Sequence, residues 1–367
     1  MTTTIPTLPT TRPYATPIPY RARRDTMVAL AGLALIGGLY LDGWAHIHVP
    51  ELETFLTPWH AILYSGFLLL SLAISLPVLF CRLRNLTWRA ALPIGYGLGL
   101  LGIALFSLGG LTDLGWHSIF GVEADSEALL SPPLLLLAIG AGLMLTTPLR
   151  AAWRRPEASQ HWSSWFAPLL SATLLLALLG FFTSYVHPFT YVAAASSERP
   201  VSHMKTHINV DHAVASIILQ TSVVSGILLL LLRRWGVRWP LGSLTMLTIV
   251  TLPPLTLMFD RVLATGPFPL IVAAGLAGLA GDGFLYLLQP SHERLWAVRL
   301  FAMMLPTTLY GFYITMIALS NGIWWSTPLI FGGIALTGIT GWLTSYLVFT
   351  PSELLLSMDG QKEEGTS

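Results

Sequence analysis

The sequence predicts an all-α integral membrane protein, a polytopic helical bundle of about ten transmembrane helices, and three observations lead to this prediction. Hydrophobic residues make up 54% of the 367 residues and charged residues only 10%, whereas a soluble domain has about 25% charged residues. The apolar residues also fall into blocks of about 20, the length at which a helix crosses a hydrocarbon layer of about 30 Å. The third observation is the distribution of Lys and Arg between these blocks.

Each apolar block is interpreted as a transmembrane helix, because open sheet edges cannot be satisfied in lipid. The first block follows Arg21, Arg23 and Arg24 and is too long for the apolar core of a cleavable signal, so we expect it to stay in the membrane. The expected spans are 27–47, 58–81, 91–113, 131–149, 165–186, 212–232, 241–259, 267–289, 297–319 and 326–349.

The chain divides into three predicted regions. These are a disordered cytoplasmic arm over 1–25, the transmembrane bundle over 26–350 and a cytoplasmic tail over 351–367. Within the bundle we expect repeated helical hairpins over 27–81 and 91–149, a candidate third hairpin over 165–232, and further helices over 241–349.

The basic residues orient the predicted bundle. With the N-terminus inside, 16 of the 19 Lys and Arg residues fall on the cytoplasmic side, and only Arg199, Lys205 and Arg261 fall outside. Because basic residues resist translocation, this asymmetry predicts a multi-pass protein of the cell membrane with both termini in the cytoplasm. An odd number of spans would break the pattern.

Composition and motifs exclude several classes of function. The formal net charge of +1 gives no reason to expect a nucleic-acid partner, and the single cysteine, Cys81, excludes an internal disulfide or a CxxC motif. The chain has no Walker, Rossmann or HExxH motif. The expected partners are the lipid bilayer and a metal ion, with other membrane subunits as candidates.

The metal expectation comes from histidines and carboxylates at the outer helix ends. Asp42 and Asp113 each lie near the end of an apolar span, and each has a histidine four residues later, His46 and His117. This spacing places both side chains on one helix face, where they can share a cation or hydrogen-bond each other. An Asp–His capping pair would explain either one alone, but its occurrence at two equivalent places favours a site.

The equivalence extends to the start of the following span. Thr57-Pro58-Trp59-His60 follows the first pair, and Ser131-Pro132-Pro133-Leu134 follows the second. We interpret the two hairpins as an internal repeat in which Leu134 stands where His60 stands. The first copy then holds a full set, Asp42, His46 and His60, beside a partial set that includes Asp113, His117 and, as a further candidate, Glu123.

His212 is also a predicted metal ligand, and together with Asp113 and His117 it is expected either to complete the site of Asp42, His46 and His60 or to form a second one. His212 begins the sixth predicted span as His60 begins the second, and His203, His207 and Asp211 precede it as possible additional ligands, since an HxxxH pair binds metal if it is helical. Asp282 lies inside the eighth span. An intramembrane carboxylate there indicates an ion or proton path or, equally, a hydrogen-bonded packing residue.

Imidazole and carboxylate ligands without thiolate suit copper, with zinc or iron as alternatives, and the affinity order favours copper. The arrangement of Asp42, His46 and His60, with Tyr64 following on the second helix, resembles the intramembrane copper site in a helical subunit of the copper membrane monooxygenases. In that family an Asp and a His of one helix are joined by a His that starts the next helix. The resemblance covers about 25 of the 367 residues, and the spacing between the histidines is one residue longer here. It implies a candidate ligand trio rather than a shared activity.

Three functions therefore remain open. The first is a membrane metalloprotein with an outward-facing His/Asp site for copper-dependent oxidation or copper handling. The ligand types favour copper over the other ions. The second is a transporter or respiratory-complex subunit in which the cluster relays protons and Asp282 lies on the path. The third is a zinc-dependent membrane hydrolase, because the ceramidase and adiponectin-receptor group similarly holds zinc with an Asp and an HxxxH, although its ligand order differs.

Overall fold

The computed structural model describes residues 22–49, 57–84, 86–121, 129–154, 162–236, 239–259 and 265–350. Within these residues the chain is helical with no strand, and eight helices are long and apolar enough to cross a membrane, which confirms an all-α multi-pass membrane protein. The eight are α1 (Ala22–His48), α2 (Pro58–Leu83), α4 (Gly97–Phe120), α8 (Trp162–Phe182), α9 (His203–Trp235), α11 (Phe268–Leu288), α12 (Leu295–Ser320) and α13 (Thr327–Val348).

Two of the ten expected spans differ from a simple membrane helix. The fourth is a bent pair, α6 (Pro132–Leu145) and α7 (Thr147–Trp153), which meet at 43° and raise the number of spans to nine if they count as one. The seventh is α10 (Ser243–Met258), which has only 16 residues and so rises about 24 Å. Short helical segments connect the spans: α3 (Trp88–Ala91), η1 (Ser184–Val186) and η2 (Ser196–Glu198).

The bend between α6 and α7 leaves carbonyl groups without their usual helical partners, and polar side chains bind them. Arg150 donates from Nη2 to the Leu143 carbonyl at 2.7 Å, and its Nε also donates to the Gly95 carbonyl of the segment before α4 at 3.3 Å. Ser171 of α8 donates to the Leu145 carbonyl at 2.5 Å. Since a broken helix in a membrane requires such internal partners, these bonds explain how the bend is tolerated.

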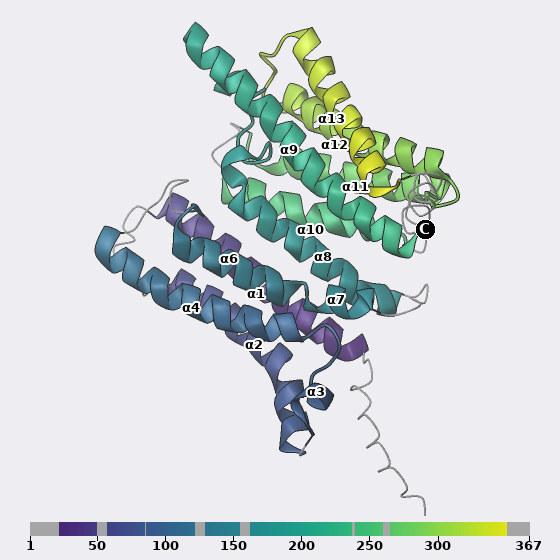
Figure 1. The fold of residues 1–367 in the computed structure, drawn as a ribbon. Coiled ribbons are helices and arrows are strands. Elements are labelled where there is room, and N and C mark those ends of the chain that lie inside the picture. Colours follow the sequence, from purple (N-terminus) through teal and green to yellow (C-terminus); the bar gives the residue numbers. More distant parts are fainter. Residues whose placement is uncertain are drawn as a thin grey trace, which may run out of the picture.

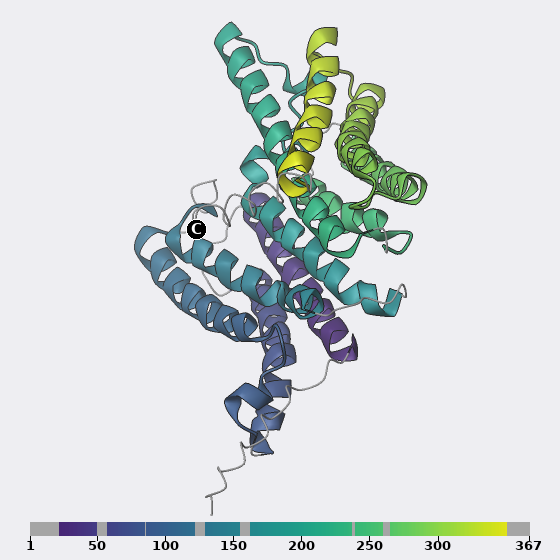
Figure 2. The same ribbon diagram turned by 45° about the vertical axis from the view of Figure 1, so that its right-hand side comes forward.

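The helices form two groups that meet at α8 and α10 (Figure 1). In the first group α1 pairs with α2 and α4 pairs with α6, while α8 packs against α1, α6 and α7. In the second group α10, α11, α12 and α13 pack in sequence and α9 closes against α13. Figure 2 shows the same separation after rotation, with α8 and α10 side by side between the two groups.

Close contact between α1 and α2 follows from two glycines. A Cβ on Gly38 would lie 2.8 Å from the Leu63 Cα, and a Cβ on Gly66 would lie 2.7 Å from the Ala34 carbonyl oxygen. Small residues let membrane helices approach until their backbones touch. The first hairpin is therefore tight enough for side chains on α1 to reach those at the start of α2.

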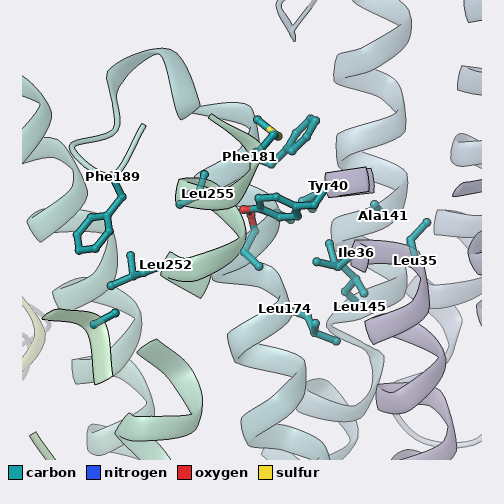
Figure 3. Packing of buried hydrophobic residues seen from close by; sticks show 14 of the residues in the cluster. Leu35, Ile36, Tyr40, Ala141, Leu145, Leu174, Phe181, Phe189, Leu252 and Leu255 are labelled. Carbon is teal, nitrogen blue, oxygen red and sulfur yellow. Dashed lines mark hydrogen bonds between the residues drawn. The ribbon is translucent and has the colours of Figure 1, made fainter. Parts of the chain in front are cut away.

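Tyr40 joins α1 to the central helix. Its hydroxyl donates to the Ala177 carbonyl of α8 at 2.9 Å, and its ring lies edge-on to Phe181 with centroids 5.3 Å apart. Figure 3 shows this ring directed from α1 toward Phe181 and Leu255, which belongs to α10. One buried contact thus links three helices just below Asp42 on α1.

The connector after α8 folds onto the bundle and is shorter than expected. The sequence predicted a connector over about 187–211, but α9 begins at His203. Tyr313 of α12 donates to the Pro188 carbonyl at 2.7 Å, and Trp324 donates through Nε1 to the Ala193 carbonyl at 2.7 Å. His187 in this connector is buried, and burial lowers its pKa to about 3. Its Nδ1 accepts the Phe189 N–H.

The predicted terminal regions are only partly within the described residues. Residues 1–21 and 351–367 lie outside them. Residues 22–25, assigned to the disordered arm, instead form the first turn of α1, and the buried Asp25 carboxylate accepts a 2.7 Å hydrogen bond from the Tyr96 hydroxyl.

Candidate metal centre

Asp42, His46 and His60 converge as the sequence predicted. One ligand atom from each lies within 4.8 Å of the others, and they are the group of three that could hold a metal ion in the described residues. Asp42 and His46 are one turn apart near the end of α1, while His60 lies in the first turn of α2. The tight α1–α2 packing brings the two helix ends together.

The spacing between these atoms fits a shared cation better than direct hydrogen bonds. The Asp42 Oδ2 lies 3.7 Å from the His46 Nε2 and 3.5 Å from the His60 Nε2. Hydrogen bonds between nitrogen and oxygen are about 2.7–3.2 Å long. Two ligands bound to one ion at about 2.0–2.2 Å lie roughly 3–4 Å apart, depending on the angle between them. Both distances fall in that range.

Thr57 orients the His60 ring. Its side-chain oxygen caps α2 by accepting the His60 backbone N–H at 3.1 Å, and the same oxygen lies 3.1 Å from the His60 Nδ1. A hydroxyl oxygen has two lone pairs, so it can accept from both nitrogens. In the tautomer that carries its proton on Nδ1, the ring donates to Thr57 and the Nε2 lone pair faces Asp42. Such hydrogen bonds to the second ring nitrogen commonly fix metal-binding histidines.

Asp42 is buried where a carboxylate needs a partner. It is 8% exposed, and its Oδ1 has no hydrogen-bond partner among the described residues. The next residue, Gly43, is held against the bundle, because a Cβ there would lie 2.7 Å from a Phe181 ring carbon and 2.9 Å from the Met258 sulfur. A buried carboxylate oxygen without a partner is costly, and a cation or proton would remove that cost.

The second pair has a similar local geometry. The His117 Nε2 lies 3.6 Å from the Asp113 Oδ1, and the His117 Nδ1 lies 3.0 Å from the Gly121 carbonyl oxygen. Because a carbonyl only accepts, Nδ1 carries the proton and Nε2 faces Asp113. Asp113 is buried at 4% exposure.

The start of α6 matches the start of α2 in its cap. The Ser131 hydroxyl accepts the Leu134 N–H at 3.4 Å, and proline follows at the first helical position, as Pro58 follows Thr57. Leu134 and His60 therefore occupy the same position relative to their caps. Both also line the same cavity.

That cavity joins the two sets of residues. It has a volume of about 290 Å³, and its lining includes the first trio together with Asp113 and His117. The other walls are mainly apolar and come from α1, α2, α4, α6, α8 and α10, with Phe181, Phe182, Met258 and Phe259 on the side of the central helices. The histidines and carboxylates thus form a polar patch in an apolar chamber.

The sequence did not identify the walls from α8 and α10 as parts of the site, whereas Tyr64 was named as part of the resemblance. Tyr64 lines the cavity, its ring centroid is 6.4 Å from that of His60, and its hydroxyl oxygen would lie 3.0 Å from a Cβ on Gly110 of α4. Its spacing of four residues from His60 places both side chains on one helix face. The contributions of α8 and α10 depend on tertiary packing and carry no local signal.

The remaining candidate ligands are not brought to the trio. His203 and His207 lie on the exposed first turns of α9, which settles that the HxxxH segment is helical, and their ring centroids are 4.9 Å apart. His212 lies near Tyr191 with centroids 6.3 Å apart, and neither it nor Asp211 lines the cavity. Glu123 lies outside the described residues. Metal binding by these residues stays a prediction.

Asp282 caps the first turn of α10. Its Oδ1 accepts the Leu244 N–H at 3.0 Å, while its Oδ2 accepts the Thr245 N–H at 3.0 Å and the Thr245 hydroxyl at 2.6 Å. A carboxylate at a helix N-terminus satisfies otherwise unpaired N–H groups and the helix dipole. This accounts for a buried carboxylate without ion passage, and the ion path stays a prediction.

The chain was also compared with known proteins. No protein-family model matches it, and neither a curated protein nor a solved structure does so.

Proposed function

We propose that the chain is an integral membrane metalloprotein in which Asp42, His46 and His60 bind one metal ion at the outer membrane face. Copper is the favoured ion, and the function is copper-dependent oxidation or copper handling. The observation that carries the proposal is the convergence of three ligand atoms within 4.8 Å at a buried carboxylate. Zinc and iron are the alternative ions, since both also accept imidazole and carboxylate ligands.

The surroundings support a reactive or exchanging ion rather than a closed structural one. Three protein ligands leave a coordination position open, as metal sites that react or exchange ligands require. The ligands line a cavity of about 290 Å³, so the open position faces space rather than packed side chains. The mainly apolar walls limit the water that competes for this position.

We further propose that the second hairpin is a degenerate copy of the first. Three features support this interpretation. Helices α2 and α6 both begin with a capping hydroxyl residue followed by proline. Helices α1 and α4 each carry an Asp–His pair, and both pairs line one cavity. Asp113 and His117 then form a partial site, with Leu134 at the position of the missing histidine.

Metal analysis of the purified full-length protein tests the proposal. After gentle extraction into detergent, copper should be present in stoichiometric amount and give a Cu(II) resonance spectrum with nitrogen coupling. His46→Ala and His60→Ala should lose the ion. His48→Ala is the matched control, because His48 lies on the same helix end and is not in the trio.

Two outcomes would reject parts of the proposal. Absence of stoichiometric copper, zinc and iron, or ion binding unaffected by both histidine substitutions, would reject the metal site. Stoichiometric zinc or iron with no affinity for copper would keep the site and reject copper.

A proton-relaying membrane subunit is the second candidate. Carboxylates and imidazoles along one cavity are also groups that relay protons, and a bridging water would connect atoms that lie 3.5–3.7 Å apart. In that case His46→Ala and His60→Ala would abolish proton movement in reconstituted vesicles while the protein binds no metal. The two candidates therefore give opposite metal analyses.

A further inference from the structure

We propose that the groove between α12 and α13 at their basic ends binds an anionic phospholipid, with the headgroup phosphate on Arg299. This site is independent of the metal centre. The groove has a volume of about 500 Å³, and it is lined by Leu295, Trp296, Arg299, Leu300, Met303, Trp342 and Tyr346. Arg299 is the one charged side chain in that lining.

Arg299 carries a charge that no carboxylate neutralises within the described residues. Its side chain is on α12, one turn from the helix start, and the residue is only 9% exposed. No Asp or Glu of the described chain lies within 4.0 Å of its nitrogens. A nearly buried cation without an opposite charge is costly and attracts an anion.

The guanidinium is held in place by neutral partners. Nη1 donates to the Ser345 hydroxyl at 3.0 Å, and Nη2 donates to the Phe349 carbonyl at 2.6 Å. The charged carbon lies 3.7 Å from the centroid of the Tyr346 ring. A guanidinium has five N–H groups, so these two bonds fix its orientation and leave donors for a phosphate.

The other lining residues suit a lipid better than a free anion. Trp296 is 63% exposed and Tyr346 is 42% exposed, and both are residues enriched at the membrane interface. Leu295, Leu300 and Met303 supply an apolar path from Arg299 along the groove. A phosphate on Arg299 with an acyl chain along this path would contact both kinds of surface.

The end of the bundle around this groove is basic. Arg233 of α9 donates to the Val348 carbonyl at 2.9 Å, next to the carbonyl that Arg299 binds. Arg294 precedes α12, and His292 contacts the Arg233 carbonyl at 2.9 Å. The Lys and Arg distribution predicts that this end faces the cytoplasm, where anionic lipids concentrate and where basic pockets between helices bind their headgroups.

Lipid binding to the full-length protein in detergent tests this. Native mass spectrometry would measure retention of dioleoyl phosphatidylglycerol against dioleoyl phosphatidylcholine, which has the same chains and no net charge. We expect one phosphatidylglycerol to be retained at least about fivefold more strongly. Millimolar inorganic phosphate should not displace it, because the acyl chain contributes to binding.

Matched variants locate the site. Arg299→Gln should remove the preference for phosphatidylglycerol, and Arg299→Lys should keep part of it. Arg294→Gln removes the same charge from the same helix end outside the groove and should leave the preference unchanged. Arg299→Gln also removes two hydrogen bonds within the protein, so a second variant is needed that leaves them intact. Trp296→Ala changes an exposed wall of the groove, and it should weaken phosphatidylglycerol retention while the melting temperature stays normal.

Four results would overturn the proposal. The first is equal retention of the two lipids, and the second is an equal loss from Arg294→Gln and Arg299→Gln. The third is phosphatidylglycerol retention that does not depend on Arg299, which would place the lipid elsewhere on the protein. Displacement by inorganic phosphate would also overturn it, because it would identify a phosphate site rather than a lipid site.

Discussion

Asp42 on α1 and His60 on α2 face each other with Oδ2 and Nε2 3.5 Å apart, although residues 50–56 between them lie outside the described chain. Helix packing contributes to their relative position, because Gly38 and Gly66 bring the two backbones into contact. The geometry of the candidate site therefore depends on residues that are not ligands.

Thr57 should control metal affinity through the His60 ring. Thr57→Val removes the hydroxyl that contacts Nδ1 and caps α2. We expect about 10–100-fold weaker metal binding, as for other partners of ligand histidines, and a loss of about 0.5–2 kcal/mol of stability from the lost cap. Competition titration with a chelator measures the first effect, and Thr57→Ser should restore both. Unchanged affinity in Thr57→Val would show that the ring is fixed otherwise.

Gly43 should be required for the position of Asp42. A Cβ in Gly43→Ala would lie 2.7 Å from Phe181 and 2.9 Å from the Met258 sulfur, so these side chains must shift. We expect a destabilisation of about 1–3 kcal/mol together with weaker metal binding. Gly37→Ala on the same helix is the control, because nothing lies within 4 Å of its Cβ position. Thermal melting in detergent that ranks the two variants equally would contradict the packing argument.

Leu134→His should give the second hairpin a complete ligand set. The substitution places an imidazole at the capped position equivalent to His60, in the cavity lined by Asp113 and His117. We expect the copper content to rise by one ion per chain, because an Asp and two His then face one another. Leu135→His, one position along the same helix and outside the cavity lining, is the control. An unchanged copper content would reject the equivalence of the two hairpins.

His187 should make stability fall on acidification. Burial holds its pKa at about 3 in the folded protein, against about 6.5 when unfolded. Between these values the unfolded state binds the extra proton, so stability falls as the pH drops below about 6.5, by up to roughly 1.4 kcal/mol per pH unit. His187→Asn keeps an acceptor for the Phe189 N–H. Its melting temperature should decline less between pH 7 and pH 5 than that of the wild type; parallel curves would refute the assignment.

Asp282→Asn should destabilise the protein without altering the metal centre. An amide can accept only one of the two backbone N–H groups that the carboxylate binds and turns a donor toward the other. We expect a loss of about 1–3 kcal/mol, seen as a lower melting temperature, with unchanged copper content. Uptake of protons or ions into vesicles is the opposing measurement. If Asp282→Asn abolishes this uptake at a temperature where the variant remains folded, the result would instead support the predicted ion path.

Local chemistry made much of the structure predictable. Apolar runs of about 20 residues predicted where the membrane helices lie. The four-residue spacing of Asp42 and His46 correctly placed these two side chains on one face of α1. The position of His60 was predictable because a Thr-Pro pair marks a helix start, which put the histidine at the same membrane level as the end of α1.

Long-range packing was not predictable in this way. The bend at α6–α7 depends on Arg150 and Ser171, which lie on different helices and bind the freed carbonyls. The cap that Asp282 provides for α10 joins residues 38 positions apart, so the isolated sequence left packing and ion passage equally open. His187 similarly became buried only because the connector folds against α12 and the segment before α13.

The apolar walls of the cavity have a consequence for the order in which the centre is completed. The three ligands come from residues 42–60, whereas Phe181, Phe182, Met258 and Phe259 are made much later. Because synthesis proceeds from the N-terminus, the first hairpin exists before α8 and α10 do. Under the proposed function, an ion could therefore be loaded onto the ligand set before the later helices enclose it.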